Sequence, residues 1–122
     1  MRLTIRHVTS YRFENPVAYG LQQLRKTPKS TWGQTVTDWQ TDILGGAREV
    51  SFEDNHNNVV ELISFEREAT QVTVTSSGVV EIDDTAGIMG KHKGPSPQWL
   101  YLRSTPLPPA GQGVRALVRV AR

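Results

Sequence analysis

The sequence contains no cysteine. This absence excludes disulfide bonds, thiolate metal sites and a cysteine nucleophile from the 122 residues of the chain. Long apolar runs are missing too, because no stretch approaches the roughly 18 apolar residues that a membrane-spanning helix needs. Polar residues alternate after Met1-Arg2, so we expect no signal peptide, a cytoplasmic location and no membrane partner.

A strong excess of one charge is also absent. The chain has 14 basic and 12 acidic residues, which give a formal net charge of +2. The densest basic stretch is Arg25-Lys26-Thr27-Pro28-Lys29, whereas nucleic-acid-binding proteins usually gather many basic side chains on one face. We therefore expect no nucleic-acid partner.

The dominant feature that is present is a period of two at the start of the chain. Alternate positions carry mostly apolar or aromatic side chains: Leu3, Ile5, His7, Thr9, Tyr11 and Phe13. This alternation predicts a long strand that is buried on one face. We expect the strand to end in a turn at Asn15-Pro16, because proline fixes its own φ and restricts the residue before it.

Further strand patterns follow along the first two thirds of the chain. They cover residues 34–44, 49–53, 59–66 and 70–82, with a segment of unclear type at 21–25 and a break at Gly45-Gly46. The last pattern resumes after Ser76-Ser77-Gly78, which we interpret as a bulge or bend rather than a stop. A series of short strands without an amphipathic helix between them predicts an all-β domain at residues 1–82. We expect an antiparallel β-sandwich, immunoglobulin-like or an open barrel, of about six to eight strands.

The composition changes after Ile82, and residues 83–122 are expected to form a connector and an irregular tail. Trp99-Leu100-Tyr101-Leu102 is a compact apolar cluster among prolines, and we predict that Trp99, Tyr101 and Leu102 contact another domain or a second copy of the chain. The last segment has one helical stripe, which predicts a short terminal helix; its members are Val114, Leu117, Val118 and Ala121. Because the chain stops within this pattern, we expect it to be part of a longer protein or a truncated gene product.

One stretch, residues 53–58 (EDNHNN), is rich in groups that bind metals. A calcium loop of the EF-hand type needs alternating oxygen ligands, a central glycine and flanking helices, which this stretch lacks. Asn and Asp instead tolerate left-handed backbone and bond to their own backbone two residues on. We therefore predict a hairpin loop from Asp54 to Asn57 or Asn58, and no metal.

The other candidate constellations have simpler structural interpretations. The spacing of the three histidines fixes no ligand geometry, the acidic pairs are expected to be solvated, and the tryptophans favour core or interface packing over a sugar-stacking platform. No Gly-x-Ser-x-Gly motif and no glycine-rich phosphate loop occurs. We therefore predict no catalytic, cofactor-binding or metal-binding residue and no cofactor. The residues concerned are His7, His56 and His92; Asp83-Asp84 and Glu66 with Glu68; and Trp32, Trp39 and Trp99.

In order and spacing, these motifs resemble the N-terminal domain of bacterial transglutaminase-like proteins. That family's first strand typically reads His-x-Thr-x-Tyr-x-Tyr/Phe with a proline soon after, and here the motif consists of His7, Thr9, Tyr11, Phe13 and Pro16. In that family a Gly-Gln pair follows a stretch rich in proline and serine, and here this pair is Gly33-Gln34. A second hairpin carries Asp-x-x-Gly-Asn, which corresponds to Asp54–Asn58 here. Asn57 stands where the family usually has glycine, so this position is expected to need a positive φ. The resemblance covers most of residues 1–82 and extends faintly to Tyr101–Leu107.

The resemblance implies an all-β accessory domain that precedes a papain-like catalytic domain carrying a Cys-His-Asp triad. None of that triad is expected on this chain. The partner would be this catalytic domain in the same protein, with a homo-oligomer formed through the tail as a further expectation. Two alternatives remain: a stand-alone module that binds protein or carbohydrate, and a small independent hydrolase, for which no activated nucleophile is recognisable.

Overall fold

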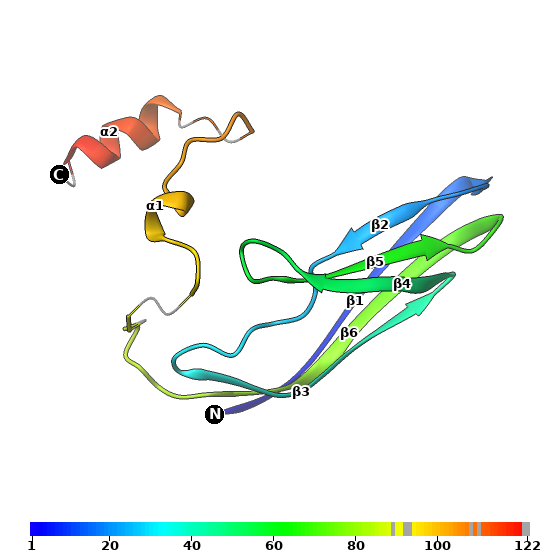
Figure 1. The fold of residues 1–122 in the computed structure, drawn as a ribbon, viewed down its shortest axis with the longest axis horizontal. Coiled ribbons are helices and arrows are strands. Elements are labelled where there is room, and N and C mark those ends of the chain that lie inside the picture. The colour runs from blue at the N-terminus through cyan, green and yellow to red at the C-terminus, as the bar shows by residue number, and fades with distance from the viewer. Residues whose placement is uncertain (89, 92–93, 108, 110, 121–122) are drawn as a thin grey trace.

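The computed structural model describes residues 1–88, 90–91, 94–107, 109 and 111–120. Residues 1–82 form two three-stranded antiparallel sheets that pack face to face (Figure 1). The β6 sheet has the order β1 (Arg2–Val17), β6 (Ala69–Ile82) and β3 (Gln34–Leu44). The β5 sheet has the order β2 (Leu21–Leu24), β5 (Val59–Phe65) and β4 (Gly46–Glu53). The predicted all-β sandwich is thus confirmed with six strands.

The core lies between the two sheets and takes side chains from both. Leu24 and Ile63 of the β5 sheet contact Val72 and Val74 of the β6 sheet, and each is at most 5% exposed. Phe13, Ile43, Phe65 and Ala69 pack around this cluster. Alternate positions of β6 are buried from Val72 to Val80, as period-two patterning requires.

Strand β6 continues without interruption through Ser76-Ser77-Gly78, so the expectation that this stretch does not end the strand is confirmed. The pairing with β1 and β3 is regular from Ser76 to Gly78, so the bulge offered as one interpretation does not form there. Gly78 pairs with Trp39 on β3, and a Cβ atom at Gly78 would lie 2.1 Å from the carbonyl oxygen of Asp38. Glycine is therefore needed here because another backbone approaches too closely for a side chain.

The break predicted at Gly45-Gly46 is only one residue long, because β3 ends at Leu44 and β4 begins at Gly46. Gly45 has a φ of +81°, and it carries the chain from the β6 sheet into the β5 sheet. A Cβ atom there would lie 2.2 Å from the carbonyl oxygen of Gln71. Strand β4 starts directly at Gly46, three residues before the predicted start at Glu49.

Two predictions for the first strand were wrong. Strand β1 does not end at Asn15-Pro16 but runs on to Val17, with an irregular register between Arg12 and Val17. Proline is tolerated because β1 is an edge strand, where a missing N–H leaves no partner unsatisfied. His7 and Tyr11, which were predicted to lie on a buried face, are exposed. Strand β1 has 16 residues, whereas the strands of the facing sheet have only 4–8 residues and do not cover its whole length.

Two short helices follow the sandwich: α1 (Gln98–Tyr101) and α2 (Gln112–Val120). The second confirms the helix predicted from the stripe of Val114, Leu117 and Val118, and Ala121 of that stripe is outside the described residues. The helical turn over the Trp99 cluster was not predicted. Neither helix contains a buried residue, and both lie to one side of the sandwich (Figure 1). In the part of the chain that the structure describes, neither helix has the length and apolar character of a membrane span.

Candidate functional site

The EDNHNN stretch forms the predicted turn between β4 and β5. The N–H of Asp54 donates to the carbonyl of Asn58 (3.0 Å), and the N–H of Asn57 donates to the carbonyl of Asp54 (2.9 Å). Asn57 has a φ of 60°, which confirms the positive φ expected where the resembling family has glycine. The prediction of a hairpin loop is therefore confirmed.

The carboxylate of Asp54 holds this turn together. Its Oδ1 accepts the N–H groups of His56 and Asn58 (both 2.9 Å), and its Oδ2 accepts Nε of Arg25 (3.0 Å) and Nδ2 of Asn58 (3.2 Å). The Asn58 N–H and, next, the Arg25 guanidinium hold the pKa of Asp54 well below its usual range, although partial burial opposes them. Both oxygens are thus occupied within the fold.

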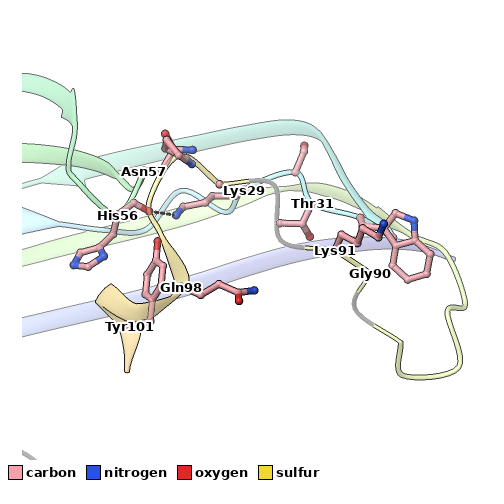
Figure 2. A pocket seen from close by; sticks show the side chains of 13 residues that line it. Lys29, Thr31, His56, Asn57, Gly90, Lys91, Gln98 and Tyr101 are labelled. Atoms are coloured by element: carbon pink, nitrogen blue, oxygen red, sulfur yellow. Dashed lines mark hydrogen bonds between the residues drawn. The ribbon is translucent and has the colours of Figure 1, made fainter. Parts of the chain in front are cut away.

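A hollow of about 810 Å³ lies beside this turn. Its walls come from three segments: the loop before β3, the β4–β5 turn, and the connector that leads into α1. In Figure 2, His56 and Tyr101 lie at one end of the hollow and Thr31, Gly90 and Lys91 at the other. The lining residues are Lys29, Ser30, Thr31, Trp32, Gly33, His56, Asn57, Gly90, Lys91, Gly94, Pro95, Gln98 and Tyr101.

The loop before β3 is fixed by hydrogen bonds at both ends. Lys29 Nζ donates to the carbonyl of His56 (2.7 Å), as the dashed line in Figure 2 shows. The Gln34 side chain donates to the carbonyl of Lys29 (2.7 Å), and Ser30 Oγ accepts the N–H of Val36 (3.0 Å). The hydroxyl of Ser30 therefore helps to hold the loop against the start of β3.

A tight turn presents Trp32 to the hollow. Thr31 and Gln34 exchange backbone hydrogen bonds (2.9 and 3.1 Å), and Gly33 has a φ of +80° that closes the turn. The indole of Trp32 is 49% exposed and lies against Gly90, where a Cβ atom would come within 3.1 Å of the ring. Trp32 is thus held between the sandwich and the connector.

The connector is attached to the sandwich at the β4–β5 turn. Ser96, 8% exposed, donates its hydroxyl to the carbonyl of Asn55 (2.7 Å). The rings of His56 and Tyr101 lie with their centroids 5.4 Å apart and tilted by 48°. Through Ser96 and Tyr101, these contacts hold the connector and α1 against the β4–β5 turn.

The lining of the large hollow combines positive charge with aromatic surface. Its described lining residues include the cations Lys29 and Lys91 and the half-exposed aromatics Trp32 and Tyr101, and no carboxylate. Such a surface attracts anionic or amphipathic partners. Sequence patterns had singled out His56, Asn57 and the aromatics, and Lys29 only as part of a basic stretch. They did not indicate that Lys29, Lys91 and Gln98, which are far apart in sequence, meet in the folded chain.

The other predicted candidates do not converge on one site. His7 is exposed on β1, His56 lies in the turn, and His92 is outside the described residues. No group of three or more His, Cys, Asp or Glu side chains within the described ranges could hold a metal ion. Trp32 lines the large hollow, Trp39 lines a smaller one and Trp99 is exposed, so they do not share one platform.

The acidic pairs occupy turns. Asp84 accepts the N–H of Ala86 (3.0 Å) at the start of the connector. Glu66 and Glu68 are exposed in the β5–β6 turn, where Glu68 has a φ of 61°. These positions fit the solvated charges expected from the sequence.

The tail residues predicted to make contacts differ in their surroundings. Trp99 and Leu102 are 63% and 84% exposed, and Tyr101 is 52% exposed although its ring contacts His56. Their predicted contact with another domain or a second copy stays a prediction, since only this chain is present.

Comparisons with known proteins bear on the sandwich. Residues 3–81 match the family model described as the bacterial transglutaminase-like N-terminal region. Over 82 residues the chain is 32% identical to an uncharacterized protein of Mycobacterium leprae (strain TN), covering 67% of this chain and 29% of that protein. The chain thus spans less than a third of that relative's length. No solved structure matches the chain.

Proposed function

This chain belongs to the family of the bacterial transglutaminase-like N-terminal region, and from this membership we propose that it is a non-catalytic accessory domain. It supports, and orients substrate for, a transglutaminase-like cysteine hydrolase domain in the same protein. The chain itself has no cysteine, so a cysteine nucleophile has to come from elsewhere.

The structural observation that supports this proposal is the exposure of large apolar side chains in the tail. Trp99 and Leu102 are largely exposed, and in α2 Leu117 is 75% exposed and Val118 48%. Large apolar side chains that gather on the surface of a small domain mark contacts with a partner. Tryptophan in particular is enriched at the centres of such contacts.

A second exposed apolar surface lies on the β5 sheet. Leu62 is adjacent in sequence to the core residue Ile63, so it points to the outer face of the sheet. Val50 pairs with Leu62, and Phe52 lies two residues further along the same face. Val50 and Phe52 are 47% and 46% exposed, and this face supports the interpretation as a domain that packs against another.

A stand-alone binding module is the alternative function. The large hollow with Trp32, Tyr101 and two lysines favours it, because concave sites with aromatic walls bind ligands. The two functions differ in what covers the tail: a domain partner in the first, and solvent in the second.

The reading frame of the gene provides the first test. A cysteine-containing domain encoded after residue 122 is expected, and a frame that ends there contradicts the proposal. The longer protein is then compared with the 122-residue chain by amide hydrogen exchange. We expect α1 and α2 to become protected in the longer protein, and unchanged exchange in both helices would show that the tail is not the contact.

A matched pair of substitutions tests whether Leu102 of the tail makes the contact with the catalytic domain. Leu102→Ser is expected to abolish much of the added protection and to lower hydrolase activity. Leu107→Ser removes the same side chain from a position that is 94% exposed in the same tail, and it is expected to change neither. If the two substitutions lower protection and activity equally, Leu102 makes no specific contact and only the overall apolar character of the tail matters.

A further inference from the structure

A second, smaller hollow opens between the two sheets on the side where β3 and β4 meet. It has a volume of about 350 Å³, and no motif found in the sequence points to it. Its lining residues come from β3, β4, β5 and the loop after β2. They are Thr27, Trp39, Gln40, Thr41, Asp42, Arg48 and Glu61.

Glu61 is the charged residue at the base of this hollow. It alternates along β5 with Ile63, so its side chain points into the sandwich, and it is 7% exposed. Its Oε1 bonds to Nε of Arg48 (2.6 Å). Its Oε2 is buried and has no hydrogen-bond partner among the described residues.

The facing sheet contributes a second unsatisfied group. Thr41 pairs with Ser76 across β3 and β6, and its Oγ1 is also buried without a partner in the described part of the chain. The carbonyl of Thr41 accepts Nη2 of Arg48 (2.8 Å). Arg48 therefore bridges the two sheets, and one buried oxygen from each sheet, on residues that line the same hollow, has no partner among the described residues.

These free oxygens define the chemistry of an occupant. A carboxylate oxygen only accepts hydrogen bonds, so the occupant has to donate to Glu61, and the Thr41 hydroxyl can either donate or accept. A buried polar group without a partner is costly, which favours an occupant over an empty hollow. Because Arg48 already balances the charge of Glu61, a neutral donor fits better than a metal ion or an ammonium group.

The other lining residues indicate which kind of neutral hydrogen-bond donor fits the smaller hollow. Trp39 offers an aromatic surface beside the polar side chains of Thr41 and Arg48. Gln40 and Asp42 are exposed and alternate along β3 with the inward-facing Thr41, so they lie at the rim. Several hydrogen-bonding side chains around one aromatic residue fit a compact ring that carries many hydroxyl groups. The volume lies at the lower end of the roughly 300–1,000 Å³ typical of ligand pockets, so it suits one such ring.

We propose that this hollow between the sheets, built around Glu61, Thr41 and Arg48, binds a single neutral sugar or cyclic polyol unit. This site is separate from the tail and from the β5 sheet's outer face. Its test can therefore fail while the accessory-domain function holds, and the reverse.

The test is a titration of the 122-residue chain followed by two-dimensional ¹H–¹⁵N NMR. The probes are methyl glucoside and myo-inositol, with cyclohexanol as a ring of the same size that has one hydroxyl, and methylammonium as a cation. We expect saturable shifts with either polyol at the amides of Thr41, Arg48 and Glu61 and at the Trp39 indole. Absent or non-saturable shifts, or equal shifts from cyclohexanol or methylammonium, overturn the proposal.

Matched variants locate the binding. Thr41→Val removes the unsatisfied hydroxyl with little change in shape, and it is expected to weaken polyol binding about tenfold, as the loss of one good hydrogen bond does. Thr35→Val is the control, because it makes the same change at an exposed position of β3. Equal affinity of the two variants overturns the assignment. Glu61→Gln, with folding checked by circular dichroism, gives a second measurement if Thr41→Val does not fold.

Discussion

The sandwich and the tail of this protein have equally regular apolar patterns but very different burial. In the sandwich, alternate residues of β6 are buried, and Val72 is fully inaccessible to solvent. In the tail, α2 has a clear apolar stripe, and none of its residues is buried. The difference shows that periodicity predicts which face of an element is apolar, whereas burial depends on a second element that packs against that face.

The largest expected effect tests the sandwich side of this comparison. Ile63→Ala removes a side chain that is 0% exposed at the centre of the core, so it leaves a cavity between the sheets. We expect the free energy of unfolding to fall by about 2–5 kcal/mol. Urea denaturation of both proteins measures it. A loss close to zero would mean that the sheets do not pack through this cluster.

An intermediate effect concerns the turn to which the tail is attached. Asp54→Asn keeps the size of the side chain and removes its charge, so it weakens the bonds from Arg25 and from the backbone N–H groups. Thermal denaturation should show a lower midpoint at neutral pH. Asp84→Asn serves as the control because Asp84 accepts one backbone N–H in a turn of the connector, and its midpoint should barely change.

The stability lost in Asp54→Asn is expected to depend on pH in one direction. The pKa of Asp54 is lower in the folded chain than its ordinary value, so its carboxylate stabilises the fold above that ordinary value. This contribution is lost as the pH falls from there towards the folded pKa. The wild-type protein should therefore approach the stability of Asp54→Asn in acid, and a constant difference across the acid range would contradict the assignment.

The smallest effect belongs to the tail. Leu117→Ser changes a residue that is 75% exposed, so in the 122-residue chain it should alter the free energy of unfolding of the sandwich by less than about 0.5 kcal/mol. Urea denaturation under the conditions used for Ile63→Ala measures it. A loss as large as that of Ile63→Ala would show that α2 packs on the sandwich in solution.

Much of the secondary structure could be predicted from local patterns. The strand at 34–44, the helix over Val114–Val118 and the positive φ of Asn57 follow from alternation, helical spacing and turn chemistry, which act over a few residues. The end of β1 could not be predicted in this way. Pro16 stops a central strand but not an edge strand, and strand order is decided by the whole sheet.

The candidate sites were less predictable than the strands. Both hollows are formed by segments distant in sequence, and their polar groups carry no local motif. One signal was present: in VVELISF, Glu61 falls on the inward period with Ile63 and Phe65. A charged residue at an inward position indicates a buried polar site, but its partner Arg48 becomes evident only when β4 pairs with β5.

The sequence by itself determined the all-β class, a range of six to eight strands, the turn at Asp54–Asn58 and the absence of a cysteine nucleophile. Each of these depends on residue type or on spacing within one segment. Only the tertiary structure decided that His7 and Tyr11 are exposed, that Arg48 joins the two sheets, and that α2 buries nothing. These features depend on which elements face one another, and that arrangement minimises the free energy of the whole chain rather than of any one segment.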